Sequence, residues 1–320
     1  VFTRADGSSV SVCIGEDEND PVFCISDLLV HLAQEQMTKN AKEVVEGEAL
    51  NLIVGGRPLE GEEKDAVKAN VLKLLADKYG VEEEDFLSAE LEIVPAGKAR
   101  DMGFDRSMIL AYGHDDRVCA YPSMMAVLDY EGTPEYTLCC IVTDKEEIGS
   151  VGATGMASHY LENTVELYAC TADYCELAVR RCLRNSRMLS SDVSAGYDPN
   201  FASAFEKKNS AFLGRGICFN KFTGSRGKSG SNDANPEFMA SLRKIMDDAG
   251  VAFQTAELGR VDLGGGGTIA YLCAKYGMNV IDSGIPVLSM HAPYEVVSKV
   301  DLYEGYRGYC AFLQGAKPVE

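Results

Sequence analysis

The regular alternation of β-prone and helical segments after residue 99 is the feature that most limits how this chain can fold. Residues 278–282 and 286–290 are rich in strand-forming side chains, whereas 118–128 and 269–276 have helical patterns. Chains that alternate strands with helices build α/β sheets with helices on both faces. We therefore predict that residues 99–320 form one α/β domain of this kind.

Three further elements are predicted in this part of the chain. The apolar run 136–143 is expected to be a buried strand, and 161–185 is expected to be one long helix. A second helix begins at Asn235-Pro236, where Asn is a helix cap and Pro suits the first turn, and it ends at Gly250.

Residues 1–98 lack this regular alternation of strands and helices and are predicted to form a separate, smaller domain. Strands are expected at 51–54 and 89–95, with an amphipathic helix over 62–79 between them. Gly80 supplies the stop signal for that helix. An apolar segment at 28–32 carries His31.

The charge of the chain excludes one class of partner. Of its 320 residues, 49 are Asp or Glu and 30 are Lys or Arg, which gives a net charge of −19. A nucleic-acid binder needs a basic surface to displace counterions, so no nucleic-acid partner is expected. No apolar stretch approaches the ~18 residues that a membrane span requires, so no membrane partner is expected either.

Cysteine usage indicates the compartment. The eleven cysteines show no repeated C-x-x-C framework, and the N-terminal residues carry no charged-then-apolar signal. Reduced thiols in a reducing compartment are the natural interpretation. The sequence therefore predicts a cytoplasmic protein.

Four polar clusters follow predicted elements, at 113–117, 144–150, 191–200 and 290–295. Open α/β sheets bind ligands at such places, where strands end. Each cluster alone has an ordinary explanation as a helix cap, a solvated charge pair or a turn. Only their combination in one α/β domain indicates a functional site.

The chemistry of these clusters suits a divalent metal. The neighbouring charges of Glu146 and Glu147 repel, so burying both is costly without a cation. With a cation present, one carboxylate can be a ligand while the other accepts a proton from water. Asp115, Asp192 and His291 extend the set to one that suits two zinc-like ions sharing a carboxylate. The pattern favours a metallohydrolase.

Residues 144–150, Asp-Lys-Glu-Glu-Ile-Gly-Ser, resemble the Glu-Glu motif of the aspartyl aminopeptidase and aminopeptidase I family of dinuclear zinc exopeptidases. The likeness continues, in order and spacing, over essentially all 320 residues. The resemblance implies a zinc-exopeptidase-like mixed sheet with helices on both faces, plus a smaller β-rich dimerisation domain. The other matching motifs are His114-Asp115-Asp116-Arg117, Ser191-Asp192 with Asp198-Pro199-Asn200, Gly266-Gly267-Thr268-Ile269 and Met290-His291.

The same resemblance implies a role for each residue of the metal site. Asp115 would bridge both ions, and Glu146 would be the general base that deprotonates the attacking water. Glu147 and His291 would complete the shell of one ion, and Asp192 would bind the other. The ions would be zinc, with manganese and cobalt as alternatives that suit the same ligands.

Substrate-binding residues follow from the resemblance as well. The loop 264–268, with Gly267 and Thr268, would line the cleft, and Lys221 would lie in the substrate pocket. His31 would reach the active site of a neighbouring subunit. The ordinary alternative for His31 is a histidine that faces the core.

Residues 1–98 resemble the family's inserted dimerisation domain, and 99–320 resemble its catalytic domain. The family also has an N-terminal His-x-Asp motif that supplies a metal ligand, and none of the four histidines here lies in such a motif. We therefore expect both domains to lack N-terminal residues, or else the protein to be degenerate.

The resulting expectation is a metal-dependent aminopeptidase that releases N-terminal residues from peptides. It would self-associate into dimers and a larger homo-oligomer. The alternative is a catalytically impaired metallopeptidase-like protein that serves assembly or binding.

Overall fold

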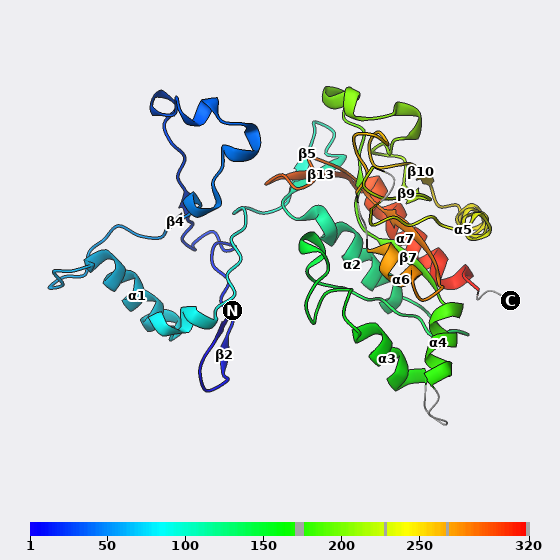
Figure 1. The fold of residues 1–320 in the computed structure, drawn as a ribbon, viewed down its shortest axis with the longest axis horizontal. Helices are drawn as coiled ribbons and strands as arrows, with labels where there is room; N and C mark the ends of the chain where they lie inside the picture. The colour runs from blue at the N-terminus through cyan, green and yellow to red at the C-terminus, as the bar shows by residue number, and fades with distance from the viewer. Residues whose placement is uncertain (170–175, 227–228, 267–268, 318–320) are drawn as a thin grey trace. The chain divides into compact units, whose positions relative to one another are not determined.

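A computed structural model describes residues 1–169, 176–226, 229–266 and 269–317 (Figure 1). The chain forms two compact units, Val1–Lys98 and Ala99–Glu320.

Two parallel strand pairings follow one another along the chain in the larger unit. Strand β7 (Arg187–Ser191) pairs with β11 (Asn279–Gly284), and the chain then continues on both sides into β8 (Ser194–Ala195) and β12 (Pro286–Leu288), which also pair in parallel. Backbone hydrogen bonds persist across the junction at residues 192–196. The pairing therefore joins a four-stranded sheet to a five-stranded sheet.

Both sheets mix parallel and antiparallel neighbours, as the predicted mixed sheet requires. The strand orders are β10-β9-β11-β7 and β5-β6-β13-β12-β8. The remaining strands are β5 (Arg100–Met102), β6 (Met108–Ala111), β9 (Ile217–Asn220), β10 (Phe253–Thr255) and β13 (Glu295–Ser298).

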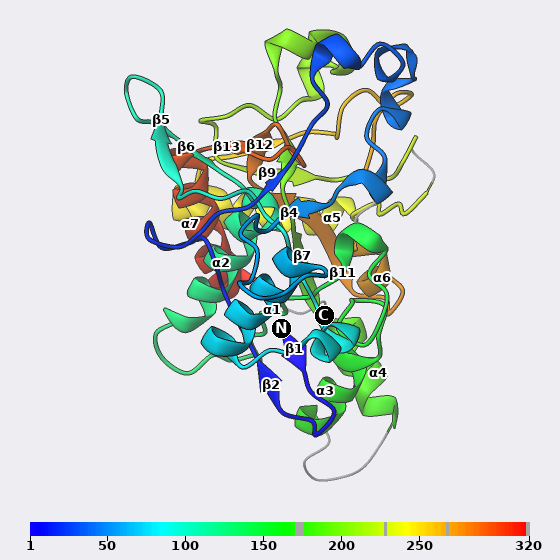
Figure 2. The same cartoon turned by 90° about the vertical axis from the view of Figure 1, so that its left-hand side faces the viewer.

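Helices cover both faces of the four-stranded sheet. Ile281 of β11 packs in a cluster with α5 and α7, while its neighbour Val280 packs with α4 and α6. Successive strand side chains point to opposite faces, so the predicted two-sided arrangement is confirmed. In Figure 2, α7 (red) and α2 lie on one side of β7 and β11, and α6 lies on the other. The α-helices are α2 (His114–Leu128), α3 (Tyr160–Ala169), α4 (Glu176–Asn185), α5 (Pro236–Ala249), α6 (Ala270–Ala274) and α7 (Lys299–Gly315).

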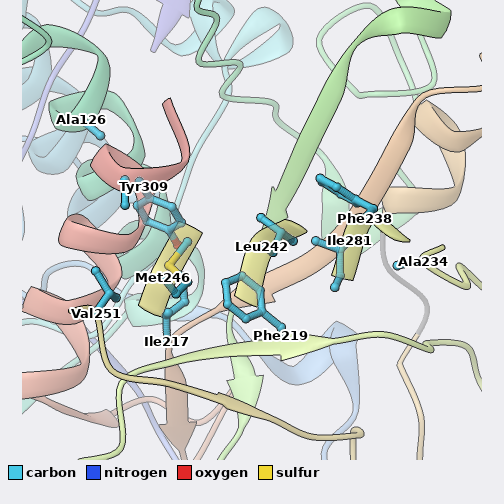
Figure 3. Close-up of a cluster of buried hydrophobic side chains, with 11 residues drawn as sticks. Ala126, Ile217, Phe219, Ala234, Phe238, Leu242, Met246, Val251, Ile281 and Tyr309 are labelled. Carbon is cyan, nitrogen blue, oxygen red and sulfur yellow. The ribbon is translucent and has the colours of Figure 1, made fainter. Parts of the chain in front are cut away.

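Helix α5 shows how local sequence positions the core. It begins at Pro236, and Gly250 ends it in the left-handed conformation, both as predicted. Leu242 and Met246 of α5 are fully buried against β9 and α7 (Figure 3). Burying an aliphatic side chain of this size contributes about 1.5–3 kcal/mol.

The smaller unit contains less strand than the predicted β-rich domain. Its helix α1 (Ala66–Tyr79) starts later than predicted and ends at Gly80 as predicted. The segment 89–95 is not a strand; only Ala89 forms a bridge, to Phe2. No other described strand runs beside this segment to satisfy its backbone groups. The strands are β1 (Phe2–Thr3), β2 (Ser9–Val10), β3 (Cys24–Ile25) and β4 (Leu52–Ile53), and the 3₁₀ helices are η1 (Val30–Leu32), η2 (Gln36–Thr38), η3 (Ala41–Glu43), η4 (Gly47–Ala49) and η5 (Glu83–Ser88).

Two predicted elements of the larger unit differ from the structure. Residues 136–143 form no strand, and Val142 is 66% exposed, because no described strand pairs with this run. The helix expected over 161–185 is present as α3 and α4, and residues 170–175 lie outside the described part of the chain. The 3₁₀ helices here are η6 (Glu146–Ile148), η7 (Pro199–Ala204) and η8 (Lys207–Asn209).

None of the helices in the described ranges combines the length and the low polarity that a bilayer span needs. The cysteines that the structure describes are all free thiols. The cytoplasmic location itself stays a prediction.

Gly284 gives a test of how tightly the two strand pairs are joined. A Cβ at this position would lie 1.5 Å from the carbonyl oxygen of Asp192. We expect Gly284→Ala to lower the free energy of unfolding by about 2 kcal/mol or more, because β11 must move away from residue 192. Equilibrium urea unfolding measures this change.

Gly308→Ala in α7 is the matched control. This glycine also lies in the core, but a Cβ there would meet its nearest neighbours at 3.5–3.6 Å, an ordinary contact distance. Since Ala is favoured over Gly in a helix by about 1 kcal/mol, the control should be neutral or stabilising. Equal stability of the two variants would contradict the tight junction.

Candidate metal centre

Three ligand-type side chains from separate segments converge in the larger unit. Asp115 lies in the first turn of α2, Glu147 in η6, and His291 between β12 and β13. The Nε2 atom of His291 is 3.1 Å from Oδ2 of Asp115 and 3.2 Å from Oε1 of Glu147. One ligand atom from each residue lies within 4.8 Å of the other two.

A second group shares Asp115 with the first. It contains Asp115, Asp116 and Asp192, whose ligand atoms also lie within 4.8 Å of one another. Asp192 sits at the junction of β7 and β8, where its N–H donates to the carbonyl of Ser283 at 3.0 Å. The structure therefore places two possible ion sites around one common carboxylate.

The electrostatics of these carboxylates are unfavourable without a cation. Burial, followed by the charge of Asp192, raises the pKa of Asp115 to about 7 and that of Asp116 to about 9. Burial, followed by the charge of Glu146, raises the pKa of Asp192 to about 6. Each shift records the cost of placing negative charges together away from water.

The residues fit a divalent cation. Oδ1 of Asp116 is buried and has no hydrogen-bond partner among the described residues. Buried carboxylates are normally paired or bound to a metal. Carboxylates with one imidazole are ligands that zinc, manganese and cobalt all accept.

Glu146 lies beside both groups. Its side chain is half-buried, and burial and the charges of Glu147 and Asp115 raise its pKa. In turn, its charge raises the pKa of Asp192. A carboxylate so placed can accept a proton from a water held at the centre.

Local backbone geometry explains how the two glutamates are presented. Lys145 and Gly149, on either side of η6, both have left-handed backbone conformations. The N–H of Ser150 donates to the carbonyl of Lys145 at 2.7 Å, which closes the turn. The two adjacent glutamates therefore lie on a tight turn. This turn forms although the run 136–143 before it is not the buried strand that the sequence predicts.

Sequence reasoning missed two residues at this centre. The sequence motifs assign Asp116 no ligand role, yet it belongs to the second group. Glu295 was given no role, yet its carboxylate accepts hydrogen bonds from the N–H groups of Asp115 and His291. The available signal was a charged residue at the start of an apolar strand, four residues after His291.

Lys221 lies outside both ligand groups. It follows β9, is exposed, and its Nζ is 2.5 Å from Oδ1 of Asp233. A small hollow next to it is lined by Phe222, Thr223, Glu257 and other residues. The role of Lys221 in substrate binding stays a prediction.

Gly267 and Thr268 lie outside the described residues, but the glycines before them are described. The N–H of Gly224 donates to the carbonyl of Gly266 at 3.2 Å. Gly265 has a left-handed φ of +86°, and a Cβ there would lie 2.2 Å from the carbonyl oxygen of Gly224. Only glycine lets these two loop segments approach so closely.

His31 belongs to the smaller unit, in η1. It is exposed, and Leu29 and Leu32 on either side are exposed as well. The alternative of a core-facing histidine is therefore wrong. Its proposed reach into another subunit stays a prediction.

Comparisons with known proteins give a consistent assignment. A family model described as "Aminopeptidase I zinc metalloprotease (M18)" matches residues 1–313. The probable M18 family aminopeptidase 1 of Clostridium acetobutylicum is 60% identical over 315 residues, which are 98% of this chain and 68% of that protein. The corresponding protein of Thermotoga maritima is 45% identical over 316 residues, 98% of this chain and 69% of that protein.

Solved structures agree with the sequence comparison. The crystal structure of aminopeptidase I from Clostridium acetobutylicum has a TM-score of 0.90 and 59% identity, covering 98% of this chain and 68% of that chain. The Thermotoga maritima enzyme has a TM-score of 0.92 and 43% identity, covering 98% and 70%. A dodecamer from Saccharomyces cerevisiae, at 21% identity, TM-score 0.68 and coverage of 97% and 66%, shares the fold.

His291→Ala tests the first ligand group. We expect the affinity for Zn²⁺ to fall more than the roughly 10–100-fold that loss of an outer-shell partner costs, because a ligand itself is removed. The measurement is competition with a chromophoric chelator. His159→Ala is the control, since His159 is exposed and pairs only with Glu162 in the described structure. Equal affinities in the two variants would remove His291 from the centre.

Proposed function

Because this chain belongs to the aminopeptidase I zinc metalloprotease (M18) family, we propose that it releases N-terminal residues from peptides with two divalent ions and Glu146 as general base. Membership of the family makes the protein a metal-dependent aminopeptidase. The number of ions and the residue roles are our proposal. The observation that supports them most is the pair of ligand groups that share Asp115.

The ligand groups suggest how two ions would be held. Asp115 would bridge both ions, with Glu147 and His291 completing the shell of one. Asp192, with Asp116 beside it, would hold the other. When bound, such ions polarise a carbonyl oxygen and lower the pKa of water. Zinc is the metal that the family description names, and we propose it for this chain.

Glu146 would carry the proton through the reaction. Its carboxylate takes a proton from the attacking water as the water oxygen bonds to the scissile carbonyl carbon. It then gives that proton to the leaving nitrogen as the C–N bond breaks. In the absence of a cation, burial and the charges of Glu147 and Asp115 raise the pKa of Glu146. A carboxylate beside the ligands that is not itself a ligand is the group type that general-base catalysis uses.

The free α-amino group of the peptide would be held by acidic groups at the centre, which is what makes the enzyme an exopeptidase. A site with several carboxylates attracts such a cationic group. Lys221 and the loop with Gly267 and Thr268 would bind other parts of the substrate.

Residues 1–98 would serve self-association into dimers and a larger homo-oligomer, with His31 reaching a neighbouring subunit. The segment around His31 exposes a run of large apolar side chains, and such patches commonly mark interaction surfaces. A relative of the same fold has been solved as a dodecamer. The exposed residues are Leu28, Leu29, Val30, Leu32 and Met37.

Glu146→Gln separates the general base from the ligands. We expect kcat to fall by about 10²–10⁴-fold, the usual contribution of general acid–base catalysis, with the metal content unchanged. The measurements are turnover of an aminoacyl-anilide and elemental analysis of the same samples. Glu237→Gln, at an exposed position of α5, is the control. A near-normal rate would remove the role of Glu146, and loss of metal would make it a ligand.

Metal content distinguishes the aminopeptidase from the assembly alternative. We expect two ions per chain by elemental analysis after equilibration with Zn²⁺ and removal of excess metal, because two ligand groups share Asp115. A protein kept only for assembly or binding has no need of a bound pair of ions. Absence of any tightly bound ion would favour that alternative.

A further inference from the structure

We propose that Glu295 is a positioning residue of the metal centre. Its carboxylate holds the backbones of Asp115 and His291 so that their side chains stay at ligand distance from each other. The proposal rests on the metal-binding role of Asp115 and His291 proposed above, and it adds a residue that touches neither ion nor substrate.

The hydrogen bonds of Glu295 are the first support. Its Oε2 accepts from the N–H of Asp115 at 3.0 Å, and its Oε1 accepts from the N–H of His291 at 2.8 Å. Each oxygen therefore holds one of the two residues. The side chain is only 2% exposed, so water does not compete for these bonds.

The position of Glu295 in the sheet is the second support. It is the first residue of β13, which lies between β6 and β12 at the centre of the five-stranded sheet, and it pairs with Ala111. Beyond the ends of β6 and β12 lie Asp115, in the first turn of α2, and His291, in the turn before β13. Through its carboxylate, this central strand thus holds the backbone N–H groups of Asp115 and His291 in place.

The backbone of the two turns is the third support. His291 has a left-handed φ of +65°, and Asp115 departs from helical geometry within α2. The left-handed backbone of His291 is uncommon for a residue other than glycine, whereas the torsions of Asp115 are ordinary extended ones. Hydrogen bonds to a buried carboxylate are charge-assisted and about twice as strong as neutral ones, which suits them to hold such turns.

The charge of Glu295 points the same way. In the described ranges of the chain, no basic side chain forms an ion pair with it. Its negative charge therefore stays close to the ligands and favours a bound cation. If Glu295 served folding alone, its two hydrogen bonds could be made to any backbone N–H groups. Both instead go to residues of the first ligand group.

Asp301 supplies a matched control for that simpler role. It is fully buried and accepts from the N–H groups of Gly214 and Gly216 at 2.7 and 2.6 Å. Like Glu295, it accepts hydrogen bonds from two backbone N–H groups, but it lies in α7 and belongs to neither ligand group. Glu295→Gln and Asp301→Asn each replace one accepting oxygen by an amide nitrogen that cannot accept.

The test measures the affinity of each variant for Zn²⁺ by chelator competition, together with the visible spectrum of the Co²⁺-loaded protein. We expect Glu295→Gln to weaken Zn²⁺ binding by about 10–100-fold and to change the Co²⁺ spectrum, as loss of an outer-shell partner does. Asp301→Asn should lower the melting temperature without changing either readout. Wild-type affinity and spectrum in Glu295→Gln would overturn the proposal, whatever its melting temperature.

A second variant covers the case in which Glu295→Gln does not fold. Glu295→Asp keeps the charge and both acceptors but shortens the side chain by one methylene. We expect weakened Zn²⁺ binding here too, and unchanged binding would overturn the proposal. If the wild-type protein itself binds no Zn²⁺, the proposed function fails. If wild type and variants bind equally well, only the role of Glu295 fails.

Discussion

The repulsion among the carboxylates around Asp115 is the constraint on which the rest of the larger unit depends. Asp116 follows it in α2, Asp192 approaches it from the junction of β7 and β8, and burial raises the pKa of all three above that of an exposed aspartate. Such a gathering costs free energy and persists only where the surrounding structure holds it and a cation compensates it. The sheets and α2 hold the three aspartates in place, and their ligand chemistry indicates the cation.

The junction of the two sheets shows how Asp192 is held in place. Asp192 lies where β7 ends and β8 begins, with its N–H bonded to β11 and its carbonyl oxygen packed against Gly284. A side chain at that glycine would force the strands apart. The same junction that makes the sheets continuous therefore also fixes one side of the candidate metal centre.

Sequence patterns gave the helices more reliably than the strands, for a physical reason. The start and end of α5 are encoded locally by Pro236 and Gly250, since a first-turn proline and a C-terminal glycine each act within one turn. The runs 89–95 and 136–143 have strand composition, but a strand also needs a partner along its length. Among the described residues, 136–143 has no strand partner, and 89–95 meets the β1 segment only at Ala89 and Glu90. Likewise, residue types pointed to Glu147 and His291, whereas Glu295 bonds to backbone N–H groups that every non-proline residue carries. A charged residue at the start of an apolar strand marks Glu295 as unusual, but no pattern of side chains indicates which backbone groups it bonds to.

The link from Glu295 to the two turns has a consequence for the motions of the centre. An amide in a surface turn ordinarily exchanges its hydrogen with solvent through small local openings. The amides of Asp115 and His291 are bonded to a buried carboxylate on a central strand, so any local opening that frees either amide must break a charge-assisted bond to the core. In deuterated water, these two amides should therefore exchange more slowly than those of an ordinary surface turn, which ties both segments to the core.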